Sequence, residues 1–141
     1  MRILAFVIPF VLTSTLSCTE EQWEIITGCS GGVTGGGSGY IVSSQGDLFK
    51  WRSSTPENLT RAHVSQLPRQ TVVEWKSRFE HVRFGELRYK KVRNMTCSLA
   101  LRTSEDERVV RWPISGPFPP DEVMHVFNEI KALGKAGSQK K

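Results

Sequence analysis

Hydrophobic and polar residues alternate along several short segments of the chain, which is the pattern of β-strands with one buried face. The clearest segment is 95–102, where an apolar residue or cysteine stands at every second position. The same alternation predicts strands over 23–27, 40–43, 48–52 and 108–112, with a short edge strand over 87–90. A turn at Ser44–Asp47 joins two of these strands into a hairpin, because Gly46 can take the positive φ of a tight turn.

Aromatic residues recur at the apolar positions of this pattern. Phe49 and Trp51 share one face of the hairpin. All the tryptophans stand at periodic apolar positions and are therefore predicted core residues: Trp23, Trp51, Trp75 and Trp112. The alternative is that Trp51 and Trp112, which lie near strand ends, form a surface platform. The polar stretch 53–66 after the hairpin is predicted to be irregular.

Two segments replace the alternation with a spacing of three to four residues, which gives a helix one apolar stripe. The first begins near Pro68 and carries Val72, Trp75, Phe79 and Val82. The second begins at Pro120 and carries Val123, Val126, Phe127, Ile130 and Leu133. We expect Gly134 to end this second helix, as glycine commonly does. Residues 135–141 are then expected to be a disordered basic tail.

The predicted elements follow one another in the order βββαβββα. Hairpin-connected strands and two amphipathic helices together favour the α+β class. The sequence therefore predicts a single domain over 23–134, built from an antiparallel sheet of about 5–6 strands with both helices on one face.

The first residues have a different pattern, in which Arg2 precedes the apolar run Ile3–Leu12 and small residues follow. This is the layout of a secretory signal peptide. The run is too short for a membrane-spanning helix, which needs about 20 apolar residues, and Pro9 interrupts it. We therefore expect residues 1–17 to be a signal peptide, residues 18–22 to be a polar tether, and the chain to be exported.

Cys18 follows the small residues directly and resembles the lipidated cysteine of bacterial lipoproteins, which becomes the mature N-terminus. Lipidation would hold the chain on a bacterial membrane, facing the periplasm or the exterior. The alternatives are ordinary signal-peptidase cleavage with free secretion, and a retained anchor. Lipidation also removes the odd cysteine, since the chain has three and an unpaired thiol is a liability in an oxidising compartment.

Cys29 and Cys97 remain as a pair, and both fall on predicted inward faces. A disulfide between the first strand and the strand over 95–102 is the leading prediction. Two free buried thiols and a metal site are the alternatives. A zinc site needs further ligands at close spacing, whereas His63, His81 and His125 stand far apart. No metal or other cofactor is therefore expected.

A glycine-rich stretch occupies residues 28–39 and is predicted to be a surface loop between strands over Gly31–Gly39. It is no phosphate-binding loop, because it lacks the lysine of that motif and leads into a strand. Glycine lets another backbone approach closely, so this loop is also the candidate partner site. The predicted contact residues are Gly31, Gly32, Gly35, Gly36, Gly37, Gly39 and Tyr40.

Catalytic motifs are absent from the sequence. Ser30 and Ser38 stand among glycines, but neither has the spacing or the strand-to-helix context of a nucleophile elbow. The net charge of +5 comes from charges of mixed sign. No nucleic-acid-binding motif accompanies it, and export argues against such a partner. We therefore expect a protein without enzymatic activity.

The run Ser30–Gly35, followed by a strand with a tyrosine, a turn and a strand with a tryptophan, resembles small bacterial proteins of the emfourin type, which inhibit protealysin. The resemblance spans Glu21–Leu133 and implies strands, a helix, a hairpin and a C-terminal helix. It also implies a protease as the partner. This chain differs in its longer glycine run, its two further cysteines and its signal peptide, so no inhibitory residue is assigned.

These features predict an exported, lipid-anchored binding module with a protein partner. The first alternative is a structural or accessory envelope lipoprotein without a discrete ligand site. The second is a small hydrolase with unrecognised chemistry around Ser30 or Ser38.

Overall fold

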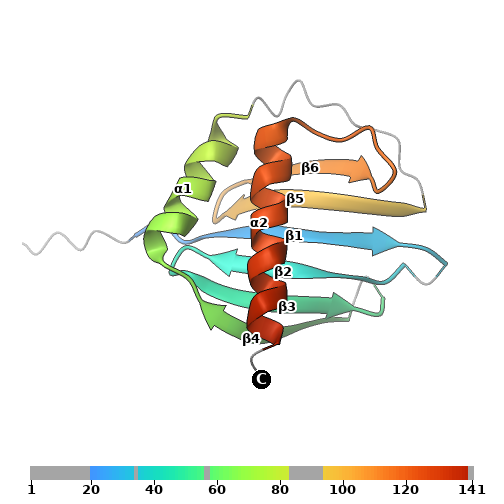
Figure 1. Ribbon diagram of the computed structural model, residues 1–141, viewed down its shortest axis with the longest axis horizontal. Coiled ribbons are helices and arrows are strands. Elements are labelled where there is room, and N and C mark those ends of the chain that lie inside the picture. Colours follow the sequence, from blue (N-terminus) through green and yellow to red (C-terminus); the bar gives the residue numbers. More distant parts are fainter. Residues whose placement is uncertain (1–19, 34, 56–57, 83–93, 140–141) are drawn as a thin grey trace, which may run out of the picture.

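The computed structural model describes residues 20–33, 35–55, 58–82 and 94–139. Within them, six strands form one antiparallel sheet, and two helices lie on one of its faces (Figure 1). The strands are β1 (Trp23–Gly31), β2 (Gly37–Ser43), β3 (Asp47–Ser53), β4 (Leu59–Gln66), β5 (Met95–Thr103) and β6 (Glu107–Pro113). The helices are α1 (Arg69–Glu80) and α2 (Asp121–Ser138). The predicted α+β fold with both helices on one face is confirmed.

The core lies between the sheet and the two helices. β1 stands near the middle of the sheet, whose order is β4-β3-β2-β1-β5-β6. Because side chains alternate along a strand, each strand turns one set of residues toward the helices. The buried strand residues of the core are Trp23, Ile25, Tyr40, Val42, Leu48, Cys97, Leu99, Leu101, Val110 and Trp112.

Both helices begin directly after a proline, as predicted, since Pro68 and Pro120 are their N-terminal caps. The predicted stripes are confirmed for the buried residues Val72, Trp75, Phe79, Val123, Val126, Phe127 and Ile130. The helices are joined by a hydrogen bond of 2.6 Å that Trp75 Nε1 donates to Glu129 Oε2. His125 Nε2 lies 2.9 Å from the other carboxylate oxygen of Glu129.

The end of α2 differs from the prediction. Helix α2 continues past Gly134 to Ser138, so Gly134 does not end it and residues 135–138 are not disordered. Gly134 is buried, whereas Leu133 is exposed. The reason is close packing, because a Cβ atom on Gly134 would overlap the ring of Tyr40. A Cβ atom on Gly137, one turn further on, would likewise lie 2.6 Å from Val64 Cγ1.

A fourth strand lies in the polar stretch that was predicted to be irregular, and that prediction is wrong. β4 pairs with β3 along its length, with a register shift between Leu48 and Phe49. It forms one edge of the sheet, and most of its residues are exposed. An exposed edge strand needs no regular apolar alternation, which explains why the sequence pattern fails there. The edge strand predicted over 87–90 lies outside the described residues.

The face of the sheet opposite the helices carries Phe49 and Trp51. They share a face as predicted, but Leu48 and Lys50 are the β3 residues that face the helices. Trp51 is half-buried, and Trp112 is buried in the core on the other face. Trp23, Trp75 and Trp112 are thus core residues, whereas the surface platform of Trp51 and Trp112 is wrong.

Candidate functional site

The glycine-rich stretch lies at one end of the sheet, together with the start of β5 and the end of β6 (Figure 1). Gly31 pairs with Met95, and the Gly32 amide donates a hydrogen bond to the Asn94 carbonyl. The Ile114 amide donates to the Met95 carbonyl at 3.2 Å. We call this end of the sheet, with Gly32, Val33, Met95 and Ile114, the loop end.

The loop itself is shorter than predicted. Gly31 is the last residue of β1, and Gly37 and Gly39 belong to β2, so these three residues are not in a loop. The connection is confined to residues 32–36. Gly32 and Gly35 have φ angles of +84° and +67°, which favour glycine, and both face open space. Gly39 is a glycine for another reason, because a Cβ would meet the backbone of Thr27 and Gly28.

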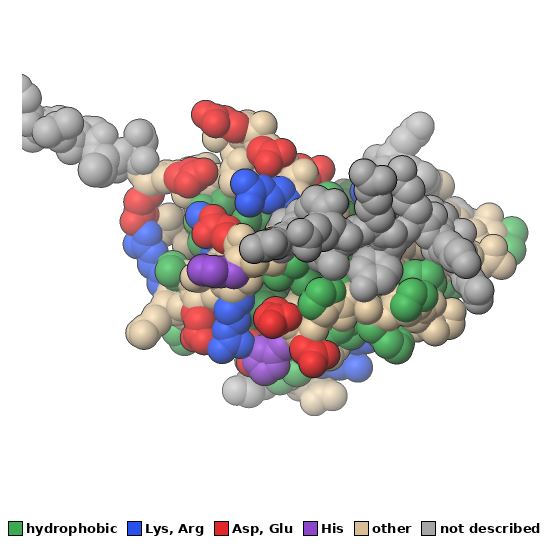
Figure 2. Space-filling model, turned by 90° about the horizontal axis from the view of Figure 1, so that it is seen from above, with side chains coloured by type: hydrophobic (Ala, Val, Ile, Leu, Met, Phe, Trp, Pro, Cys, Tyr) green, Lys and Arg blue, Asp and Glu red, His purple; other side chains and the backbone are tan. Residues whose placement is uncertain are grey.

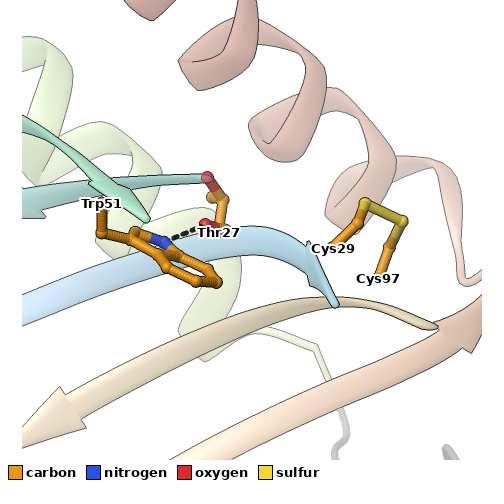
Figure 3. The surroundings of a disulfide bond; sticks show 4 residues. All are labelled: Thr27, Cys29, Trp51 and Cys97. Carbon is orange, nitrogen blue, oxygen red and sulfur yellow. Dashed lines mark hydrogen bonds between the residues drawn. A yellow bond between two sulfur atoms is a disulfide. The ribbon is translucent and has the colours of Figure 1, made fainter. Parts of the chain in front are cut away.

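Trp51 uses the space that these strand glycines leave. Trp51 stands directly opposite Gly39, which in turn stands opposite Gly28. A Cβ built on Gly28 would lie within 3.0 Å of the indole ring. Trp51 Nε1 donates a hydrogen bond of 2.8 Å to the Thr27 carbonyl (Figure 3). The indole ring therefore covers the backbone at Gly28 and Gly39, where glycine has no side chain of its own to cover it.

Cys29 and Cys97 are directly opposite each other on β1 and β5, with their Cα atoms 3.9 Å apart. Their sulfur atoms are at disulfide distance, so the predicted pairing is present. Figure 3 shows the pair on the side of the sheet that carries α2. The disulfide ties β1 to β5 close to the loop end.

A cleft of about 360 Å³ lies beside the disulfide, between α2 and the strands. It is found on the part of the helix-bearing face that α1 leaves open, since α1 lies on the other side of α2 (Figure 1). Its described lining residues are Thr27, Gly28, Cys29, Ser38, Gly39, Tyr40, Lys50, Ile114, Phe127, Lys131 and Lys135. We call it the lysine cleft. Of the predicted partner residues, Gly39 and Tyr40 line it, while Gly32 and Gly35 lie in the nearby loop.

Three lysines of the cleft were not singled out from the sequence. Lys50 comes from β3, whereas Lys131 and Lys135 come from one face of α2. Lys131 Nζ lies 5.9 Å from the centre of the Phe127 ring. The one available sequence signal was the spacing of Lys131 and Lys135, which places two like charges on adjacent helical turns. Lys50 reaches the cleft only through the pairing of β3 with β2, which single-strand patterns do not give.

The described residues of the loop end are all uncharged. Met95 is 40 % exposed and Ile114 53 % exposed, and Val33 is fully exposed. Among the described residues, Figure 2 shows hydrophobic side chains at this end, whereas most acidic, basic and histidine side chains lie elsewhere in the view. Exposed apolar side chains that lie together are typical of a protein-binding site.

The candidate catalytic residues lie on different elements. His63 Nε2 lies 3.4 Å from Asp47 Oδ1, His81 Nδ1 contacts the Ser77 carbonyl, and His125 contacts Glu129. Ser38 faces the lysine cleft. Among the described residues, no group of three or more histidine, cysteine or acidic side chains is arranged to hold a metal ion. Within the described residues, no helix has both the length and the apolar character needed to cross a membrane. Cys18 lies outside the described residues.

No protein-family model and no curated protein matches the chain.

Proposed function

We propose that this chain is an exported binding module without enzymatic activity, held on a bacterial membrane by lipid at Cys18. Its partner is a protein, and it binds at the loop end. The observation that carries this proposal is the presence of exposed apolar side chains at Val33, Met95 and Ile114, next to a glycine loop. A hydrophobic centre with close backbone approach is what a protein interface needs.

The position of the tether supports this arrangement. Glu20 precedes β1 and accepts hydrogen bonds from Arg69 and Gln45, and the hydrogen bond from Arg69 lowers the pKa of its carboxyl group. Glu20 therefore lies beside Arg69, at the start of α1. The loop end lies at the far end of β1, which has nine residues and therefore spans about 30 Å. A lipid anchor at Cys18 would leave the loop end directed away from the membrane.

The class of partner follows from the resemblance to emfourin-type proteins, which makes a protease the first candidate. The run Ser30–Gly35 that carries the resemblance passes from β1 into the loop. Inhibition would require the loop end to block access to the active site of the protease, which is a separate property from binding.

The experiment is affinity capture from a bacterial envelope extract, using exported protein with Cys18→Ser so that it is soluble. The test variant is Val33→Ser with Met95→Ser, which removes apolar surface without filling the core. The matched control is Val73→Ser with Leu133→Ser, because both residues are exposed apolar residues on helices. Loss of one captured protein with the test variant alone supports the proposal. Equal capture by both variants, or capture of no protein by the parent, refutes it.

A further inference from the structure

The lysine cleft has cations on two walls and an apolar floor. Lys50 projects from the sheet, and Lys131 and Lys135 project from α2. Tyr40, Phe127 and Ile114 supply apolar and aromatic surface between them. None of the described residues that line the cleft is acidic. The cleft therefore offers a positive, partly apolar environment to a ligand.

No described residue forms an ion pair with any of the three cleft lysines, whereas several other basic residues of the domain are paired. Lys76 forms an ion pair with Glu80, Arg78 with Glu74, and Arg102 with Glu107. Lys131 and Lys135, in contrast, stand one turn apart, where like charges disfavour the helix slightly. A negatively charged ligand would relieve this repulsion.

The spacing of the charges indicates the kind of anion. Residues four apart on a helix have Cβ atoms about 5–6 Å from each other, and Lys50 lies on the opposite wall. One small anion can reach only part of this arrangement, whereas carboxylates placed along an extended chain can reach all of it. Tyr40 and Phe127 are 8 % and 6 % exposed, which is too little ring surface for the base stacking that single-stranded nucleic acid uses.

We propose that the lysine cleft binds an acidic peptide segment of the protein partner, with one apolar side chain of that segment against Ile114, the exposed apolar residue of the lining. This inference rests on the proposed function, because the same partner also contacts the loop end. Ile114 lies between the two surfaces, since it lines the cleft and also pairs with Met95. The two surfaces form one continuous interface.

The first test uses a synthetic peptide in which a leucine stands between two pairs of glutamates, titrated into the Cys18→Ser protein and followed by calorimetry. Replacing Lys131 and Lys135 with glutamine should weaken binding by about tenfold, since each exposed charge pair contributes modestly. The control variant Lys76→Gln with Arg111→Gln removes the same number of charges away from the cleft and should bind as the parent does. Binding by the parent should also weaken as salt is raised.

The control ligands define what would overturn the proposal. A peptide with glutamines in place of glutamates should bind much more weakly, and so should one with serine in place of leucine. Equal binding of either peptide contradicts the cleft assignment, as does an acidic-peptide dissociation constant above about 1 mM. Tighter binding to phosphatidylglycerol vesicles than to the peptide would identify lipid as the ligand and also overturn it.

Failure here is distinguishable from failure of the proposed function. If Lys131→Gln with Lys135→Gln leaves envelope capture unchanged while Val33→Ser with Met95→Ser abolishes it, the loop end binds the partner and the cleft does not. If both double variants lose the same captured protein and the two matched controls keep it, both proposals stand.

Discussion

Gly134 in α2 lies directly against the aromatic ring of Tyr40 in β2, with no space for a Cβ atom between them. This contact brings the second half of the helix close to β2. Gly137 likewise lets the helix approach Val64 of β4 closely. The close approach also forms one wall of the lysine cleft, because Lys131 and Lys135 flank Gly134 on the helix.

Replacing Gly134 with alanine should destabilise the fold, although alanine favours a helix by about 1 kcal/mol over glycine. Overpacking a core contact typically costs about 1–3 kcal/mol, and the Tyr40 ring is held between strands and helix. Urea unfolding of Gly134→Ala measures the net effect. Ala136→Gly lies at an exposed position of the same helix. Its change in unfolding free energy therefore measures the effect of helix propensity alone. A Gly134→Ala protein more stable than the parent would contradict the packing explanation.

Glycines of the glycine-rich stretch should differ sharply in their tolerance of alanine. Gly39→Ala should destabilise strongly, since its Cβ would lie 2.5 Å from Gly28 Cα and closer still to the Thr27 carbonyl oxygen. Gly32→Ala should cost about 1–2 kcal/mol, because its positive φ is unfavourable for alanine but its surroundings are open. Thermal unfolding of the two variants measures the difference. Equal melting temperatures would show that the strand positions can relax.

The sequence was sufficient for elements that bury one face. The alternation of 95–102 and the stripes of both helices predicted β5, α1 and α2, because burial imposes a period that the chain must obey. The sequence pattern was insufficient where contacts between residues that are distant in the chain decide the structure. Gly134 looks like a helix end until Tyr40 is placed beside it, and β4 is defined by its pairing with β3 rather than by its own pattern.

The candidate site likewise has features that a local sequence pattern predicts and features that depend on contacts between distant residues. The disulfide pair followed from inward faces and cysteine number, since both are local properties. The lysine cleft did not, because Lys50 and Lys135 are distant in the sequence and meet only when α2 crosses the sheet. Phe127 was predicted as a core residue, and nothing in its spacing indicated that it also borders a cleft.

Removing the carboxylate of Glu129 should weaken the contact between the helices. Trp75 is 2 % exposed, so Glu129→Ala leaves its indole N–H without this acceptor, and an unsatisfied buried donor costs about 1–3 kcal/mol. Glu129→Gln keeps an acceptor oxygen and should be milder. His125→Ala removes only an exposed contact to the same carboxylate and serves as the control. Urea midpoints in the order parent, Gln and then Ala would agree with this role, whereas equal midpoints for all three would not.

The cysteine pair should stabilise the folded protein substantially. It links positions 68 residues apart, and chain-entropy estimates for such a loop give about 4 kcal/mol. Replacing Cys29 and Cys97 with alanine should lower the urea midpoint of the exported protein strongly, and a reducing agent should lower the parent's midpoint but not the variant's. Thiol alkylation of unfolded, unreduced protein provides the direct check. Two reactive thiols at these positions would show that the exported protein lacks the disulfide.

Lipidation at Cys18 is the prediction on which the membrane location depends. The parent protein should sediment with the membrane fraction, because several acyl chains give firm anchoring whereas a single chain binds only weakly. A Cys18→Ser protein should be recovered in the soluble fraction while its urea midpoint stays unchanged, since the residue precedes the sheet. Intact mass spectrometry distinguishes the alternatives. A mature chain that begins at Cys18 with acyl chains attached supports lipidation, whereas an unmodified Cys18 in exported protein would rule it out.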